Sequence, residues 1–370
     1  MKKWFMALLT ALSIIVLAAC GNSQTSTNNS SETNEGTTSE ASTNGSEQTF
    51  VLKSTIQSPK TASLSKGFDA FLDSVEEKSN GRIIFERYYG DALVKPADVA
   101  DAVSAGITDV AAVVPSYTPA ANPLGTIESL PALWKDQWTG TRALMDLYEE
   151  FPELRSEFED RNISILGGWA LPSYHIISKT DVGSFDDLNN LKVIASGSQA
   201  LLAEAFGAVS VGVTMPESFE AMERGAVDGG LLGYTSSSTY GIHEIAGSVW
   251  ELPIGSQGGL FGMNTDKYNQ LPDDLKQVFK EAAIENAVDF HRIYQTEGEA
   301  EAKQKYLDAG VKINEVSDED LAELQRIAEE NVWEKWVEER SDKPAQEILD
   351  RFRELIEQYD QEFQANGGQS

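Results

Sequence analysis

The stretch AMERGAVDGGLL, Ala221 to Leu232, is the second copy of a pattern that Ala102 to Val113 show first as AVSAGITDVAAV. Both copies read Ala-x-x-x-Gly-x-x-Asp. In each, an amphipathic helix ends, a glycine supplies the left-handed residue that stops it, and an Asp opens a short apolar strand. One such connection is common in α/β proteins, but two at wide separation predict two related α/β lobes.

The N-terminus has the features of an export signal. Lys2 and Lys3 precede a mostly apolar run that is too short for a comfortable membrane span and ends in Leu-Ala-Ala-Cys. This ending resembles a bacterial lipobox, so we expect residues 1–19 to be removed and Cys20 to be lipidated. An ordinary signal with an incidental cysteine is the alternative. Residues 20–48 are almost wholly Ser, Thr, Asn, Gly, Glu and Gln and predict a flexible tether.

The charge and the cysteine count exclude several classes of function. The net charge is −30, and it becomes −32 once residues 1–19 are removed with their two lysines. Nucleic acid and anionic lipid head groups repel such a polyanion, so nucleic-acid binding is excluded. Cys20 is the only cysteine in the sequence. The folded part therefore has no disulfide, thiol nucleophile or cysteine metal cluster.

Strand and helix patterns alternate from the start of the folded part. Thr49 to Ile56 predicts a strand, and an apolar face from Leu64 to Val75 predicts a helix that Asn80-Gly81 ends. The following patterns predict a strand at 82–89, a helix at 96–105 and a buried strand at 109–114. We therefore expect an α/β lobe with parallel strand pairing and right-handed crossovers.

The same alternation restarts after Trp169. Strands are expected at 175–178, 191–195, 209–213 and 227–232, and helices at 185–188, 200–206 and 217–224. The second copy of the repeat therefore lies in a second α/β lobe.

A long helix is expected next. Leu271-Pro272-Asp273-Asp274 has the proline and the acids of a helix start, and apolar residues then follow one face toward Gly310. Such a helix would be about 55 Å long at 1.5 Å per residue, which is enough to brace both lobes. Two more helices are expected, at 318–338 and 344–363.

The sequence lacks the constellations of an enzyme. His175, His243 and His291 have no metal-ligand spacing, and His291 is expected on the surface of the long helix. No phosphate loop, dinucleotide fingerprint or Gly-x-Ser-x-Gly elbow is present, and the paired acids fit solvated helix faces. We predict no catalytic residue, no metal and no other cofactor.

Two facing α/β lobes predict a ligand cleft outside the carboxyl ends of their strands, which hinge closure would bury. The expected ligand-binding residues lie near these strand ends or where the chain passes between lobes, and they are Tyr117, Trp169, Tyr174, His175, Ser196, Met215 and Tyr234. Each aromatic residue alone is more typical of packing than of ligand contact, whereas the set as a whole fits either role equally well.

Four motifs occur in order along the chain. They are Asn80-Gly81-Arg82 with a strand and Tyr89-Gly90-Asp91-Ala92-Leu93, then FDDLNNLKV at 185–193, ESFEAMERGAVDG at 217–229, and Met263-Asn264 leading to Leu271-Pro272. In this order they resemble the extracytoplasmic solute receptors of tripartite ATP-independent periplasmic (TRAP) transporters, of the dicarboxylate-receptor type. The likeness runs from about Thr49 to at least Gly310.

The resemblance implies a two-lobed periplasmic-binding-protein-like fold of type II, with α/β lobes and a long helix that bridges them. Lobe I would comprise residues 49–171 plus about 258–300. Lobe II would comprise 172–257 plus about 301–365, including the C-terminal helices.

The chain departs from the family where the ligand carboxylate binds. Family receptors usually place an arginine directly after the Lys-Ile pair, where it forms a bidentate pair with the carboxylate, and Ile194 stands at that position. A second frequent arginine aligns with Tyr174. Ile194, the eighth candidate ligand-binding position, cannot offset the cost of a carboxylate buried in a dry cleft.

Two ligand hypotheses follow. In the first, the ligand is neutral, zwitterionic or rich in aromatic groups and stacks on Trp169, Tyr174 or Tyr234; a quaternary ammonium would also suit such a cage. In the second, the ligand is an organic acid whose charge is met by Lys179, Lys192, His175 or helix N-termini.

The resemblance also implies the function. The protein would capture a small organic solute between its lobes and deliver it to a TRAP-type membrane permease, without covalent chemistry. Lipidation and a long tether favour the outer face of the cell membrane of a Gram-positive bacterium. The alternatives are an ABC-transporter substrate-binding lipoprotein and a ligand-sensing receptor for a membrane kinase. A wall or adhesion protein would need long repeat arrays or exposed apolar patches.

Overall fold

The structure, a computed structural model, describes residues 48–367. The expected signal segment, Cys20 and nearly all of the expected tether lie outside these residues.

The first lobe is built on a sheet of order β2-β1-β3-β10-β4. Its strands are β1 (Phe50–Ile56), β2 (Ile83–Tyr89), β3 (Val110–Val113), β4 (Ile163–Ala170) and β10 (Gly258–Asn264). β1 pairs in parallel with β2 and β3, as predicted. β10 runs antiparallel to β3 and β4, so the sheet is mixed and the prediction of parallel pairing is wrong for these strands. The physical reason is the path of the chain, because β10 returns from the second lobe and lies between β3 and β4.

The second lobe is built on a sheet of order β11-β9-β5-β8-β6-β7. Its strands are β5 (His175–Ser178), β6 (Lys192–Ile194), β7 (Val209–Val211), β8 (Gly229–Leu232), β9 (Ser248–Trp250) and β11 (Lys312–Asn314). β6 is parallel to β7 and β8, whereas β5 enters from the first lobe and is antiparallel to β8 and β9. This sheet is therefore mixed as well.

The repeated sequence forms the same local structure in both lobes. α2 (Val99–Ser104) ends before Gly106, and α6 (Met215–Glu223) ends before Gly225; these glycines have φ of 71° and 73°. The Asp of each copy then accepts a hydrogen bond from a backbone N–H of the neighbouring strand, in the middle of β1 in the first lobe and at the start of β6 in the second. Lys53 N donates to Asp109 Oδ2 at 2.8 Å, and Lys192 N donates to Asp228 Oδ2 at 3.0 Å. The repeat therefore joins a helix to a strand and fixes that strand to its neighbour.

Other helices lie around the sheets. They are α1 (Ser63–Lys78), α3 (Gln137–Glu150), α4 (Pro152–Glu159), α5 (Ser198–Ala205), α7 (Tyr234–Thr239) and α8 (Thr265–Gln270). The helix expected at 185–188 is a single 3₁₀ turn, η4 (Phe185–Leu188). The sequence analysis did not predict α3, α4, β4, β9 or β10.

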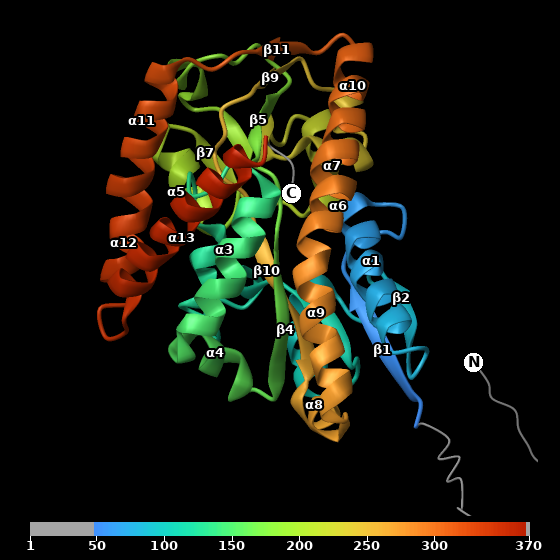
Figure 1. Cartoon of the computed structure of the whole chain (residues 1–370). Coiled ribbons are helices and arrows are strands. Elements are labelled where there is room, and N and C mark those ends of the chain that lie inside the picture. Colours follow the sequence, from blue (N-terminus) through green and yellow to red (C-terminus); the bar gives the residue numbers. More distant parts are fainter. Residues whose placement is uncertain (1–47, 368–370) are drawn as a thin grey trace, which may run out of the picture. The chain divides into compact units, whose positions relative to one another are not determined.

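The long helix is present and connects the lobes (Figure 1). It consists of α9 (Asp273–Phe290), a π-helical segment, η6 (His291–Glu299), and α10 (Ala300–Asp308). α9 packs on α1 and β4 of the first lobe, and α10 packs on α7 of the second. His291 was expected on the surface, but it is only 6 % exposed and its ring packs against Phe363. That expectation is wrong because the C-terminal helix covers this face.

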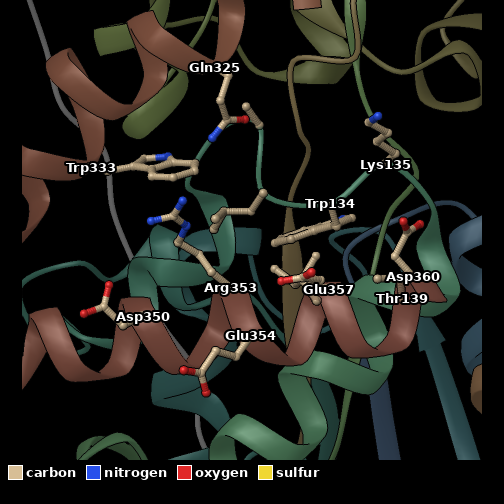
Figure 2. A pocket seen from close by; sticks show the side chains of 13 residues that line it. Trp134, Lys135, Thr139, Gln325, Trp333, Asp350, Arg353, Glu354, Glu357 and Asp360 are labelled. Atoms are coloured by element: carbon tan, nitrogen blue, oxygen red, sulfur yellow. The ribbon is translucent and has the colours of Figure 1, made fainter. Parts of the chain in front are cut away.

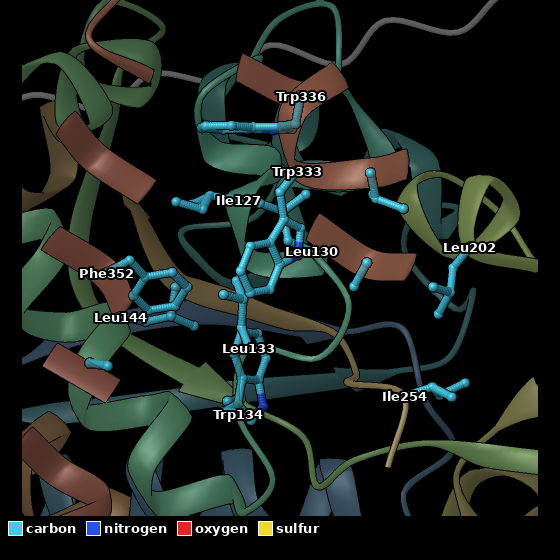
Figure 3. Close-up of a cluster of buried hydrophobic side chains, with 14 of the residues drawn as sticks. Ile127, Leu130, Leu133, Trp134, Leu144, Leu202, Ile254, Trp333, Trp336 and Phe352 are labelled. Carbon is cyan, nitrogen blue, oxygen red and sulfur yellow. The ribbon is translucent and has the colours of Figure 1, made fainter. Parts of the chain in front are cut away.

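The C-terminal helices complete the core. α11 (Asp318–Ala328) continues through a π segment, η7 (Glu329–Trp333), into α12 (Glu334–Glu338), and α13 (Ala345–Ala365) follows. α13 packs along α3 of the first lobe, although the prediction assigned it to the second. Figure 3 shows the resulting cluster, in which Trp134 and Phe352 meet with ring centroids 5.9 Å apart.

Candidate functional site

A cavity of about 120 Å³ lies between the two lobes. Its first-lobe wall comes from the segment that follows β1 and from residues near the ends of β3 and β4, and its second-lobe wall comes from α6 and α7. The lining residues are Gln57, Ser58, Pro59, Ala62, Ser63, Leu64, Tyr117, Trp169, Leu171, Tyr174, Met215, Thr235, Ser236, Thr239, Tyr240, Gln257 and Tyr294. Tyr294 belongs to the π segment of the long helix. We call this space the interlobe cavity.

The position of the interlobe cavity follows from the sheets. β1 ends at Ile56 and is followed by Gln57, β3 ends shortly before Tyr117, and β8 ends shortly before Thr235. The carboxyl ends of parallel strands in both lobes therefore open onto the same space, which is where open α/β sheets bind ligands.

Two buried polar atoms of this wall have no hydrogen-bond partner. They are Nε1 of Trp169, which can only donate, and Oε1 of Gln57, which can only accept. Trp169 is only 1 % exposed. A buried polar group without a partner costs about 1–3 kcal/mol, so a molecule that satisfied both atoms would gain affinity.

The electrostatic surroundings of the cavity are acidic. No Lys, Arg or His is among the described residues that line it. Behind the wall, Glu128 is buried and accepts hydrogen bonds from the backbone N–H groups of Ser116 and Gly258, both at 3.0 Å. Burial raises the pKa of Glu128 to about 7 despite these two donors. Burial also raises the pKa of Tyr117 to about 12, and the nearby Glu128 adds to that rise.

A second acid, Glu299, lies at the end of the π segment of the long helix and is hydrogen-bonded to Thr235 of the cavity wall. Its carboxylate accepts hydrogen bonds from the backbone N–H of Thr235, at 2.9 Å, and from the Thr235 hydroxyl. Burial raises the pKa of Glu299 above its ordinary value. The N-terminal N–H of α7 at Thr235 therefore already has an acidic partner from the protein.

The predicted site residues separate into three groups. Tyr117, Trp169, Tyr174 and Met215 line the interlobe cavity. His175 and Tyr234 instead line a neighbouring cavity of about 290 Å³. Ile194 is buried beside Gly230, and Ser196 is exposed; neither lines a cavity described in this section.

Several lining residues were not predicted. Gln57 follows the first strand, so the strand-end rule applied to β1 would have found it. Thr235 adjoins the predicted Tyr234 and could have been found from the same strand end. Tyr240 directly follows α7 and Tyr294 lies in the π segment, and only the tertiary packing brings them to the cavity.

The cations of the organic-acid hypothesis lie elsewhere. Lys179 Nζ donates to the carbonyl of Met222 at 2.6 Å, and Lys192 is exposed at the start of β6, away from the carboxyl ends. Burial lowers the pKa of His175 to about 4, so its ring is neutral at pH 7.

A larger groove of about 660 Å³ runs along α13 (Figure 2). Its α13 side carries Asp350, Glu354, Glu357 and Asp360, and Arg353 lies over the ring of Trp333 with its guanidinium carbon 5.1 Å from the ring centroid. Unlike the interlobe cavity, this groove is formed by helices and loops rather than by strand ends. Its acids fit a solvated helix face.

Residues 48–367 contain neither a metal-binding cluster nor a membrane-spanning helix. No cluster of three or more His, Cys, Asp or Glu side chains in this range could hold a metal ion. Within the same range, every helix is too short or too polar to cross a membrane.

Residues 54–340 match the family model described as bacterial extracellular solute-binding protein, family 7. A solute-binding protein of Chromohalobacter salexigens is 29 % identical over 283 residues, which span 73 % of this chain and 81 % of that protein. A monocarboxylate 2-oxoacid-binding periplasmic protein of Nostoc is 24 % identical over 312 residues, 80 % of this chain and 82 % of that protein.

Solved structures show the same fold. A TRAP solute-binding protein of Rhodoferax ferrireducens, in complex with copurified benzoate, superposes with a TM-score of 0.78 at 22 % identity, covering 85 % of this chain and 99 % of that one. A marine metagenome TRAP solute-binding protein specific for aromatic acids, bound to 3-hydroxybenzoate, gives a TM-score of 0.75 at 25 % identity with the same coverage.

Proposed function

Because the chain belongs to the bacterial extracellular solute-binding proteins of family 7, the receptors of TRAP transporters, we propose that the interlobe cavity is its solute site. The two-lobed fold expected from the sequence is confirmed. Members of this family are extracytoplasmic receptors, not enzymes, and they work with membrane permease subunits. Because the chain matches this family, the alternative of an ABC-transporter substrate-binding lipoprotein no longer applies. The finer proposal concerns the solute itself, which carries an aromatic or similar apolar ring and uncharged hydrogen-bonding groups.

The lining of the interlobe cavity supports a ring-shaped solute. Tyr117, Trp169 and Tyr174 come from the first lobe and its connection to the second, Tyr240 comes from the second lobe, and Tyr294 comes from the long helix. Aromatic side chains around a small space favour flat apolar groups through stacked and edge contacts. Similar receptors that bind benzoate and 3-hydroxybenzoate support a solute that carries a ring.

The proposal that the solute has uncharged hydrogen-bonding groups rests on one observation. The two unpartnered polar atoms, Trp169 Nε1 and Gln57 Oε1, lie in a wall that has no cation, with Glu128 and Glu299 behind it. A carboxylate enclosed there would remain unpaired, at a cost of several kcal/mol. An uncharged group that accepts from Trp169, together with one that donates to Gln57, would meet both atoms.

A matched series of ring compounds tests this proposal. Isothermal titration of the mature chain with benzamide, 3-hydroxybenzamide, benzyltrimethylammonium and benzoate compares one ring with four polar groups. We expect the amides to bind more tightly than benzoate. Trp169→Phe keeps a ring and removes the N–H, so it should weaken amide binding by about tenfold, as expected for the loss of one hydrogen bond.

The opposite result would support the organic-acid hypothesis. Tight benzoate binding that the amides do not share would show that a cation reaches the cavity when the lobes close. Lys179→Ala, Lys192→Ala and His175→Ala would then identify that cation, with Lys280→Ala as a control in which an exposed lysine on α9 is removed.

A lipid anchor at Cys20 is the second part of the proposal. It rests on the lipobox-like sequence and on the polar segment at 20–48. Labelling of growing cells with a fatty-acid analogue should mark the native chain and not Cys20→Ser. The relatives named above come from Gram-negative bacteria, so they give no support to the expected Gram-positive origin.

We also propose lobe boundaries at 49–171 plus about 258–300, and 172–257 plus about 301–340. The membership of β4 and β10 in one sheet and of β5 to β9 in the other supports this division. Since α13 packs along α3, we assign α13 to the first lobe.

A further inference from the structure

A second cavity, of about 290 Å³, lies at the connections between the lobes. Three segments pass from one sheet to the other, and each contributes to its wall. Ser173 belongs to the link from β4 to β5, Pro253 to the link from β9 to β10, and Gln295 to the π segment of the long helix. We call this space the hinge cavity, because a molecule bound in it would touch all three segments that pass from one sheet to the other.

The hinge cavity and the interlobe cavity share a wall. Tyr174, Thr235 and Tyr294 line the interlobe cavity, while their sequence neighbours His175, Tyr234 and Gln295 line the hinge cavity. Glu299 lines the hinge cavity and accepts the hydrogen bonds of Thr235 described above. A molecule bound in one cavity therefore contacts residues that are directly connected to the lining of the other cavity.

Part of the polar lining of the hinge cavity is already paired. The carboxylate of Glu251 lies beside it and holds Lys303 Nζ at 2.5 Å and the hydroxyl of Tyr234 at 2.9 Å. Gln295 Oε1 accepts from the backbone N–H of Gln137 at 2.6 Å. These contacts fix the wall and leave two other groups available.

The two available groups are Lys135 and His175. The exposed ammonium group of Lys135 has no hydrogen bond or ion pair with any residue in 48–367. Nδ1 of His175 is buried and has no partner. Burial lowers the pKa of the His175 ring, so the ring is neutral. A neutral imidazole carries one N–H, and in the tautomer that carries it on Nε2, Nδ1 is an acceptor that needs a donor.

We propose that the hinge cavity is a second small-molecule site for a short carboxylate that also carries a hydroxyl or amino group. Its carboxylate pairs with Lys135, and its O–H or N–H donates to Nδ1 of His175. Occupancy changes the affinity of the interlobe cavity for its solute, because the bound molecule spans the lobe connections and contacts the shared wall. Only this last statement rests on the proposed function of the interlobe cavity.

Nuclear magnetic resonance of the full mature chain tests the site directly. The sequence has three histidines, so ¹⁵N-histidine labelling gives three imidazoles to follow. Lactate and alanine are the probes, and propionate, which lacks the hydroxyl and amino group, is their control. Lactate or alanine should shift the Nδ1 resonance of His175 and leave those of His243 and His291 in place. Propionate should bind about tenfold more weakly, as expected for one missing hydrogen bond.

Variants separate the hinge cavity from the interlobe cavity. Lys135→Ala should weaken lactate binding by about tenfold or more, since it removes a charge-assisted hydrogen bond. Lactate binding should be unchanged in two control variants. They are Lys280→Ala, which removes an exposed lysine outside both cavities, and Trp169→Phe. Loss of lactate binding in Trp169→Phe but not in Lys135→Ala would overturn the hinge site, as would an unmoved His175 resonance with millimolar lactate and alanine.

A separate measurement tests the coupling between occupancy of the hinge cavity and the solute affinity of the interlobe cavity. Saturating lactate should change the dissociation constant of the tightest-binding ring compound at least threefold, a small but measurable coupling. An unchanged constant would refute the coupling while leaving the site itself intact. If no ring compound binds, the proposed function fails, but the histidine resonances still decide the hinge site.

Discussion

Replacement of Asp109 with alanine is expected to destabilise the protein more than the same replacement of Asp228. The two residues occupy the same position in the repeated sequence, and both carboxylates accept a backbone N–H from the neighbouring strand, at 2.8 and 3.0 Å. Their surroundings differ, because Asp109 is buried at 6 % exposure and Asp228 is partly exposed.

The magnitude follows from this difference. A hydrogen bond to a charged group contributes about 1.5–3 kcal/mol to stability. Around Asp109 water has little access, so Asp109→Ala should lower the free energy of unfolding by about 2–3 kcal/mol. Around Asp228 water can replace the carboxylate, so the loss there should be about 1 kcal/mol or less.

Urea unfolding followed by tryptophan fluorescence measures both losses. Asn retains one acceptor oxygen, so Asp109→Asn should recover part of the stability that Asp109→Ala loses. Because the two sites lie in different sheets with no shared partner, the double alanine variant should show the sum of the single losses within about 0.5 kcal/mol. Equal losses at the two positions, or a larger loss at Asp228, would refute the assignment of the repeat to strand anchoring.

Three further outcomes follow from the structure. Glu128 has a folded-state pKa of about 7, above its ordinary value of 4.5, so its contribution to stability is full below pH 4.5 and is lost as the pH rises toward 7. The stability of the native protein relative to Glu128→Gln should therefore fall by about 3 kcal/mol over that range in pH-dependent urea unfolding, and a flat difference would contradict the shift. Gly259→Ala should reduce solute affinity because its Cβ would meet both the Trp169 ring and the backbone oxygen of Val113, whereas Gly212→Ala, which meets nothing within 4 Å, should not; equal titration results would count against the interlobe cavity. Phe352→Ala should cost about 3–5 kcal/mol in thermal or urea unfolding because the side chain is fully buried between α13 and α3, and a loss below about 1 kcal/mol would mean that α13 is not firmly docked.

The sequence predicted the elements whose pattern is local. The periodic face of α1, the strand β3 and both copies of the repeat depend on side chains within a few residues of one another, and all are present. β10 escaped prediction because its sequence, GGLFGMN, has neither strand alternation nor high strand propensity. Its glycines are explained only by their neighbours, since a side chain at Gly259 would meet the ring of Trp169.

The candidate site was predictable in part for the same reason. The rule that ligands bind at strand ends located Tyr117 from the order of strands alone. Tyr174 and His175 were both selected because the chain passes between the lobes there, but successive side chains of an extended chain point in opposite directions. Tyr174 therefore faces the interlobe cavity and His175 the hinge cavity. Tyr294 required knowledge of how the π segment lies between the lobes.

Ile194 stands at the position where the sequence comparison expects a carboxylate-binding arginine, so its surroundings matter for the charge of the solute. Its side chain is 5 % exposed and packs within the second lobe, so an arginine there would have to leave this packing to reach a solute. The wall of the interlobe cavity gives stronger evidence on the charge of the solute. Glu128 is buried and Glu299 is partly buried, and desolvation raises the pKa of both carboxyl groups, so their surroundings already disfavour negative charge. A solute carboxylate in the same space would be a third acidic group whose charged form is disfavoured. An uncharged donor and an uncharged acceptor would instead satisfy Gln57 and Trp169 without adding a negative charge.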